Sequence, residues 1–189
     1  AVERARAASL PKDNIERAIA KGIGEGEEGR IESLMYEAYA PGGTALIIEC
    51  LTDNRNRTAN DVKHLLTKNG GTLAASGAVT YLFDHVGVVS VPGELSKDRH
   101  NEIELVLIDA GATNIVEEEE RVEIHCHVQD LAHVAEIVSS LGLKPDIVEF
   151  QWIPKTFVET DEATAVAVTE LIEKLEEHDD VSRVWSNIA

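Results

Sequence analysis

Alternation of apolar and polar positions divides the chain into strand-like and helix-like segments. An apolar run at residues 44–51 follows a Pro-Gly-Gly turn and predicts a strand. Apolar residues then recur at steps of three and four and predict a helix, at Ala59, Val62, Leu65 and Leu66. Thr58, with Asp61 three residues on, is its expected N-cap, and Gly70 its expected stop.

The rest of the pattern predicts two groups of elements. Residues 31–39 and 78–83 read as further strands. From residue 86 onwards six elements follow: strand 87–91, helix 102–110, strands 113–116 and 122–128, helix 131–141 and strand 147–152. This β-α-β-β-α-β order is that of the ferredoxin-like unit. Four consecutive glutamates at 117–120 are typical of a solvated hairpin tip.

A last helix and strand are predicted after Pro154. Thr160 is the expected cap of that helix, and its buried stripe is Ala163, Val166, Ala167, Leu171 and Leu175. A strand at 181–188 closes the chain. Because the block at 31–84 lacks a second helix and a last strand, residues 158–189 are expected to return and complete it. The predicted fold class is therefore α+β, with 31–85 and 158–189 as a discontinuous α/β domain and 86–157 as an inserted ferredoxin-like domain.

Charge is distributed unevenly between the two halves of the chain. The net charge is −18, yet residues 1–84 hold 10 Lys and Arg against 12 Asp and Glu, whereas residues 85–189 hold 7 against 23. The acidic half should repel nucleic acid and anionic membranes, so any phosphate contact is expected in the first half. Two cysteines, no signal peptide and no long apolar run favour a cytoplasmic protein of a reducing compartment.

Two arginines are the strongest candidates for a site. Arg55 and Arg57 are expected on the loop between a strand and a helix, beside the free N–H groups of the helix start. The helix dipole, these donors and the guanidinium groups all favour an anion there, such as a phosphate. The alternative is that both arginines form ion pairs with carboxylates of this acidic chain.

Several segments together resemble the YebC/PmpR family, which includes the mitochondrial translational activator of cytochrome c oxidase subunit I. They are PKDNIERAI at 11–19, YEAYAPGG at 36–43, ECLTDNRNRT at 49–58, KNGG at 68–71 and the segment 77–83. The resemblance covers the whole chain and implies a helical N-terminal domain, a middle α/β domain and a ferredoxin-like domain inserted into it.

The resemblance also bears on the two ends of the chain. It implies that residues 1–22 are a remnant of the helical domain and that the family's Lys-rich start precedes this chain. The Gly- and Glu-rich composition of 23–30 is itself typical of a linker between domains. The chain differs from the family by carrying Ala38, Ala40 and Ala74 where glycines are usual, and Trp185 is unusual for the last strand. Alanine tolerates positive φ poorly, so the family's loop conformation need not hold there.

Catalytic and metal chemistry find little support in the sequence. His125 and His127 would share one face of a strand while Cys126 points to the other, and no CxxC motif supplies further ligands. No Gly-x-Ser-x-Gly elbow is present, and no nucleophile has an activating context. We therefore expect a protein that is not an enzyme, with no cofactor, no metal, no small-molecule substrate and no membrane association.

Binding of nucleic acid remains the preferred hypothesis. The expected binding residues are Asn54, Arg55, Asn56, Arg57, Lys63 and Lys68, with Lys12, Arg17 and Lys21 nearer the N-terminus. With the family's link to translation, this predicts a factor associated with the ribosome and ribosomal RNA, bacterial and cytoplasmic or, in a eukaryote, in the mitochondrial matrix. The alternatives are a DNA-binding transcriptional regulator and an acidic module that binds a protein partner.

Overall fold

The computed structural model describes residues 31–93, 100–118 and 120–189, which form two compact units. Unit 1 comprises residues 31–81 and 157–189, and unit 2 comprises residues 82–156. The elements of unit 1 are β1 (Glu32–Tyr39), a 3₁₀ turn (Pro41–Gly43), β2 (Ala45–Thr52), α3 (Arg55–Lys68), β3 (Thr72–Leu73), α6 (Glu162–Glu176) and β8 (Val181–Ser186). Those of unit 2 are β4 (Phe83–Pro92), α4 (His100–Asp109), β5 (Ala112–Glu117), β6 (Arg121–His127), a 3₁₀ turn (Val128–Asp130), α5 (Leu131–Ser140) and β7 (Ile147–Pro154).

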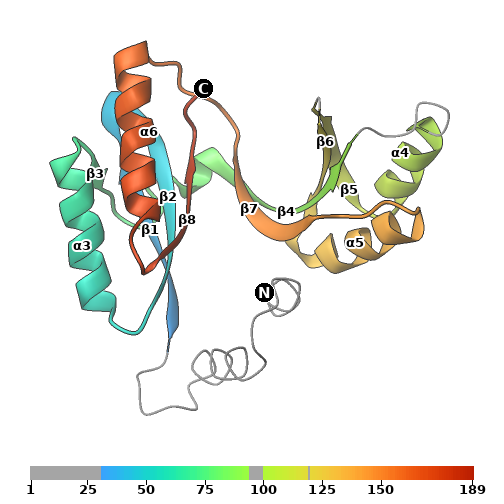
Figure 1. Ribbon diagram of the computed structural model, residues 1–189, viewed down its shortest axis with the longest axis horizontal. Helices are drawn as coiled ribbons and strands as arrows, with labels where there is room; N and C mark the ends of the chain where they lie inside the picture. Colours follow the sequence, from blue (N-terminus) through green and yellow to red (C-terminus); the bar gives the residue numbers. More distant parts are fainter. Residues whose placement is uncertain (1–30, 94–99, 119) are drawn as a thin grey trace. The chain divides into compact units, whose positions relative to one another are not determined.

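Unit 1 is a four-stranded antiparallel sheet covered on one face by two helices (Figure 1). The strand order is β3-β1-β2-β8, so the C-terminal segment pairs with β2 and completes the sheet. One core joins the sheet to α3 and α6, with the fully buried Leu46 and Ile48 from β2 packed against Leu66 and Leu171. Burial of each such side chain stabilises the unit by about 1.5–3 kcal/mol.

The β1–β2 hairpin depends on a glycine pair. Gly42 and Gly43 have φ values of 73° and 79°, a conformation that side chains disfavour. A Cβ on Gly42 would also lie 2.7 Å from Cγ2 of Thr164 at the start of α6. Ala40, where the resemblance noted above leads one to expect glycine, is extended with φ −92°, so alanine is compatible with this conformation.

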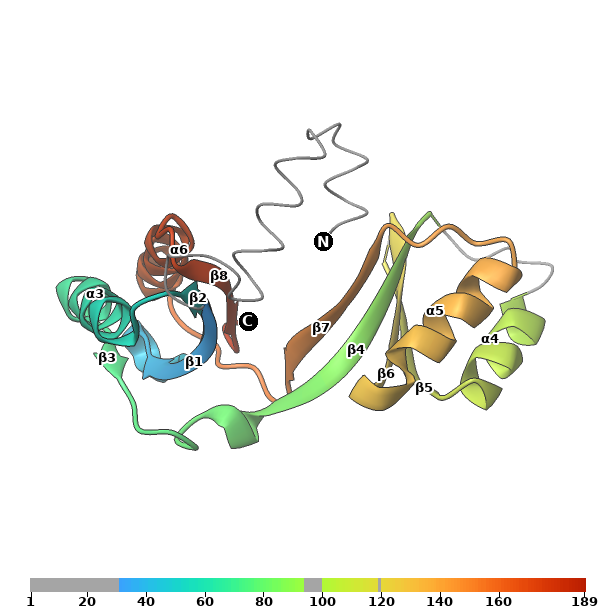
Figure 2. The same cartoon turned by 90° about the horizontal axis from the view of Figure 1, so that it is seen from below.

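Unit 2 is a ferredoxin-like unit, as the order of elements predicts. Its antiparallel sheet has the order β5-β6-β4-β7, and α4 and α5 cover one face (Figure 2). The core is aliphatic, with Val89 and Ile124 on the sheet packed against Leu107 and Val134 on the helices. Gly87 lets α5 approach the sheet, because a Cβ there would lie 2.8 Å from the Cβ of Leu131.

Three local predictions were wrong, each because a side chain intervenes. Residues 78–83 do not form a strand: residues 80–82 are a 3₁₀ turn and β4 starts at Phe83. The carboxylate of Glu37 accepts the N–H groups of Gly77, Val79 and Thr80, so these donors are not free for a sheet. Helix α6 is capped by Asp161, which accepts a hydrogen bond from the N–H of Thr164, and not by Thr160. The third wrong prediction concerns the start of α3.

Candidate nucleic-acid interface

The candidate site lies where β2 runs into α3, and α3 begins earlier than expected. The side chain of Asn54 accepts a hydrogen bond from the backbone N–H of Arg57 at 3.1 Å, which makes Asn54 the N-cap. The hydroxyl of Thr58 instead lies inside the first turn, 3.1 Å from the Asn54 carbonyl oxygen and 2.7 Å from Oδ2 of Asp180, and its single proton can be donated to one of these two acceptors at a time. Arg55, Asn56 and Arg57 therefore form the first helical turn and not a loop.

The guanidinium of Arg57 is bound to two carboxylates of the protein itself. Its Nη2 lies 3.1 Å from Oδ1 of Asp53 and 3.1 Å from Oδ2 of Asp180. Asp180 precedes β8 and also accepts hydrogen bonds from the hydroxyls of Thr58 at 2.7 Å and Thr52 at 3.2 Å. Asp180 thus connects the end of β2, the start of α3 and the start of β8.

The ionisation of this network follows from its contacts. Burial alone would raise the pKa of Asp180, but hydrogen bonds from Thr58, Arg57 and Thr52 hold it below its ordinary value. The hydrogen bond to Asp180 in turn raises the pKa of Arg57. The cation at the start of α3 is therefore already bound to the carboxylates of Asp53 and Asp180. A pocket of about 230 Å³ lies beside it and is lined by Ile31, Leu51, Thr52, Asp53, Arg57 and Asp180. Two of these residues are acidic, which disfavours a phosphate.

The alternative interpretation of the two arginines was that they form ion pairs with carboxylates of the chain. Arg57 does so with two carboxylates, and Arg55 with one at a longer distance. Nε of Arg55 lies 3.6 Å from Glu32, and 69% of its side chain is exposed. An exposed pair of this kind contributes little to stability and leaves the guanidinium accessible.

The exposed side of α3 offers a second arrangement of polar and cationic groups. We call it the outer face of α3, formed by the exposed residues Asn56, Asn60, Lys63, His64, Thr67 and Lys68. Within the described part of the chain, neither Lys63 nor Lys68 pairs with a carboxylate. Three of these residues, Asn60, His64 and Thr67, were missed from the sequence, although spacings of four and seven from Asn56 and Asn60 would have indicated them.

Charge separates the two helices that cover the sheet of unit 1. Helix α3 carries four Lys and Arg against one Asp, whereas α6 carries four Glu against one Lys. Both lie on the same face of the sheet (Figures 1 and 2). A polyanion would therefore be attracted to α3 and repelled by α6.

The remaining candidates contribute less. Lys12, Arg17 and Lys21 lie outside the described residues. Among the described residues, no group of three or more His, Cys, Asp and Glu could hold a metal ion, and Cys126 is buried with Sγ 3.5 Å from the Gly87 carbonyl. No helix in this part of the chain is long and apolar enough to cross a membrane.

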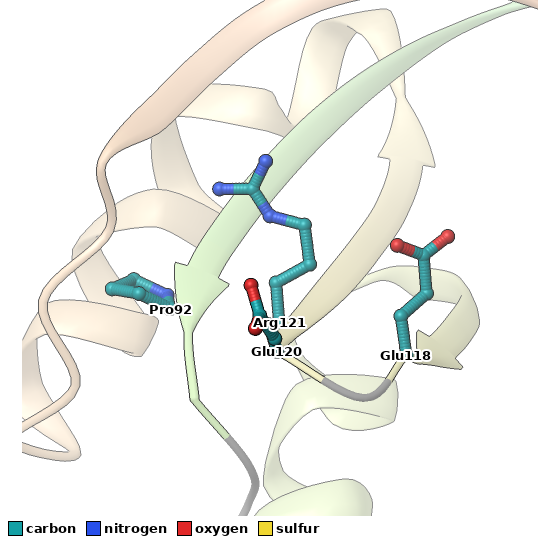
Figure 3. Close-up of a pocket in the computed structure, with 4 residues that line it drawn as sticks. All are labelled: Pro92, Glu118, Glu120 and Arg121. Carbon is teal, nitrogen blue, oxygen red and sulfur yellow. The ribbon is translucent and has the colours of Figure 1, made fainter.

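A larger pocket in unit 2 is also acidic. It measures about 670 Å³ and is lined by Pro92, Glu118, Glu120 and Arg121 (Figure 3). The one cation of this lining, Arg121, is bound to Asp146 at 2.8 Å. The pocket is thus unsuited to a phosphate.

Comparisons with known proteins agree with this architecture. Residues 31–188 match the family described as the TACO1/YebC second and third domain. A "probable transcriptional regulatory protein" of Chloroflexus aggregans is 41% identical over 188 residues, which cover 100% of this chain and 75% of the relative. A protein of the same name from Persephonella marina is 44% identical over 192 residues, with 99% and 75% covered.

A solved structure gives the same result. The conserved hypothetical protein Aq1575 of Aquifex aeolicus superposes with a TM-score of 0.87 at 42% identity, over 100% of this chain and 77% of that one. The fold therefore defines a two-unit α+β protein in which a ferredoxin-like unit interrupts a sheet covered by two helices. The chain belongs to the TACO1/YebC family.

Proposed function

We propose that this protein is a regulator of gene expression that binds nucleic acid through the outer face of α3. The observation that carries the proposal is the position of Lys63 and Lys68, two exposed cations without a carboxylate partner in the described residues of an acidic protein. Phosphate groups are the ligands that such lysines attract, and Asn56 and Asn60, which precede them on the same helix, can hydrogen-bond bases or sugars. Arg55 extends this surface at the start of the helix.

DNA is the first candidate target. Relatives that match the whole chain at about 40% identity are named probable transcriptional regulatory proteins and not enzymes. A helix with exposed asparagines and lysines is compatible with the major groove, where asparagine can pair with adenine. The proposed activity is then transcriptional regulation by binding at promoters.

Ribosomal RNA is the second candidate target, with this protein acting as a ribosome-associated translation factor. The observation in its favour is that α3 lies between β2 and β3, so the described residues contain no helix-turn-helix around it. Lysines on a single helix face suit contacts to a phosphate backbone, which folded RNA presents by shape. In this case α3 anchors the protein, and the acidic unit 2 meets a protein component.

One pair of measurements tests the interface and separates the two targets. The wild-type chain and the double variant Lys63→Ala/Lys68→Ala are compared in a mobility shift with promoter DNA and in co-sedimentation with ribosomes, each over a salt series. The binding constant K falls as salt rises, and loss of two phosphate contacts should make the slope of log K against log salt less steep by about 2. The target whose binding falls is the physiological candidate.

The control variant is Lys144→Ala/Lys174→Ala, which removes the same charge outside α3. Arg57→Ala is unsuitable as a test, because it breaks the contacts to Asp53 and Asp180. If both double variants bind as the wild type does, or lose affinity equally, the outer face of α3 is not the interface.

A further inference from the structure

Helix α4 of unit 2 exposes aliphatic side chains on the side that faces solvent. Leu105 is 64% exposed, Ile108 52% and Val106 36%. Ile103 and Leu107 of the same helix are buried in the core of unit 2. A helix on the surface of a globular unit normally has polar residues opposite its core side, so α4 departs from the usual pattern.

The direction of these side chains follows from helix geometry. At about 100° per residue, Leu105 projects opposite to the mean direction of Ile103 and Leu107, and Ile108 lies beside Leu105. We call Leu105, Val106 and Ile108 the apolar patch of α4. By contrast, Val166, which is 54% exposed, is an isolated aliphatic side chain among the charged residues of α6.

Carboxylates border the apolar patch on one side: at about 100° per residue Glu102 and Asp109 fall between Leu105 and Val106, and we call these two carboxylates the acidic rim. Glu102 and Asp109 are exposed on α4 itself, and α4 contains no Lys or Arg. His100 at the start of the helix lies 3.3 Å from Glu117 and 3.9 Å from Glu104, which places two further carboxylates near this end. Unit 2 as a whole holds 15 Asp and Glu against 5 Lys and Arg, a net charge of −10.

Aliphatic residues beside an acidic rim fit one kind of partner. We propose that the apolar patch of α4 is a docking surface for a basic, amphipathic helix of another protein, whose aliphatic side chains cover Leu105 and Ile108 while its lysines and arginines meet Glu102 and Asp109. Buried aliphatic contacts supply affinity, and the rim supplies selectivity and a fast encounter. This surface is separate from α3, so the protein can hold a nucleic acid and a protein partner on different units.

The same charges argue against the other occupants. A nucleic acid would meet carboxylates and no cation of α4. A second copy of this chain would place two acidic rims against each other, which costs free energy at close range.

The first test uses two synthetic helical peptides as probes. Both carry leucines at steps of three and four, and their other exposed positions are lysine in one peptide and glutamate in the other. Binding to the full 189-residue chain is measured by fluorescence anisotropy. We expect the lysine peptide to bind, the glutamate peptide not to bind, and Leu105→Ser/Ile108→Ser to weaken binding by about tenfold or more.

Val166→Ser is the matched control and should leave the affinity unchanged. Because Leu105 and Ile108 lie outside the core, the double variant should keep the thermal midpoint of the wild type, which shows that it is folded. Equal affinity of wild type and double variant would mean that the attraction is purely electrostatic, and would overturn the proposal.

The second test identifies the partner in cells. A photo-crosslinking amino acid replaces Leu105 and, as control, Val166, and the crosslinked species are identified by mass spectrometry. We expect at position 105 a protein with an excess of Lys and Arg that, once purified, binds the wild type and not the double variant. Crosslinks to nucleic acid or to a second copy of this chain would refute the proposal.

Discussion

Removal of the carboxylate of Asp180 tests the physical account of the site most directly. Asp180 holds Arg57, Thr52 and Thr58 although it is more than 120 residues away from each in the sequence. Its side chain is 12% exposed, and both threonines are buried. In Asp180→Ala the buried hydroxyls of Thr52 and Thr58 lose their charged acceptor. The start of α3 also loses its contact with the residue that precedes β8.

The expected loss of stability follows from those two hydroxyl contacts. A hydrogen bond to a charged group contributes about 1.5–3 kcal/mol. Thr58 retains the Asn54 carbonyl as an acceptor, and Thr52 continues to accept from the N–H of Asn54. The exposed guanidinium of Arg57 can be hydrated by water in place of Asp180 and keeps its ion pair with Asp53. We therefore expect Asp180→Ala to lower the free energy of unfolding of unit 1 by about 2–3 kcal/mol, below the sum of two full contacts.

The pH dependence has a definite sign. The pKa of Asp180 is lower in the folded protein than in the unfolded chain, where it is about 3.9. Its contribution to stability is therefore fully present above the unfolded pKa and is lost as the pH falls through the folded pKa. The difference between wild type and Asp180→Ala should be constant from about pH 5 to 8 and shrink below about pH 4.

The assay follows unit 1 by itself. The chain has two tryptophans, Trp185 on β8 and Trp152 on β7, so a Trp152→Phe background leaves Trp185 as the reporter. In urea the midpoint should fall by about 1–2 M at pH 7 for a typical slope. Asp179→Ala, the exposed neighbouring acid, is the control and should change little. A midpoint shift below about 0.3 M, or a difference as large at pH 3 as at pH 7, would contradict this account.

Three further substitutions test other contacts. Glu37→Gln should speed hydrogen exchange of the N–H groups of Gly77, Val79 and Thr80. Burial raises the pKa of Glu37, yet these N–H donors bring it below its ordinary value, so the wild type should lose this protection in acid and not at neutral pH. Gly87→Ala should destabilise unit 2 by about 1–3 kcal/mol in urea unfolding followed at Trp152, because the new Cβ meets Leu131. Asn54→Ala should cost about 1 kcal/mol in the Trp185 assay, since the N-cap of α3 is lost. Unchanged exchange rates in Glu37→Gln, or an unchanged urea midpoint in Gly87→Ala or Asn54→Ala, would contradict the contact that the substitution tests.

Local sequence patterns specify the order of the elements and the division of charge. Apolar periodicity indicated the helices α3, α4, α5 and α6 and the β-α-β-β-α-β order of unit 2, because these segments are long enough for their period to be read locally. The composition also showed that acidity is concentrated after residue 85. Both are properties of neighbouring residues, so no tertiary information was needed.

The roles of the polar side chains, in contrast, depend on contacts between segments that are distant in the sequence. Thr58 and Asn54 are both good N-caps by residue type. The hydrogen bond from the Arg57 N–H to the side-chain oxygen of Asn54 makes Asn54 the N-cap of α3. Likewise the residue types at 78–83 favour a strand, but Glu37, about forty residues earlier, accepts hydrogen bonds from backbone N–H groups of this region, at Gly77, Val79 and Thr80.

Arg57 illustrates the same limit for function. Its position beside a helix start suggested a phosphate ligand, whereas the fold brings Asp180 to it from 123 residues away. The outer face of α3 and the apolar patch of α4 are defined by which side chains are exposed. A sequence does not show which of several aliphatic or basic residues of a helix face the solvent. Local interactions act between near neighbours along the chain, but ion pairs and exposed patches depend on which distant segments the fold places together.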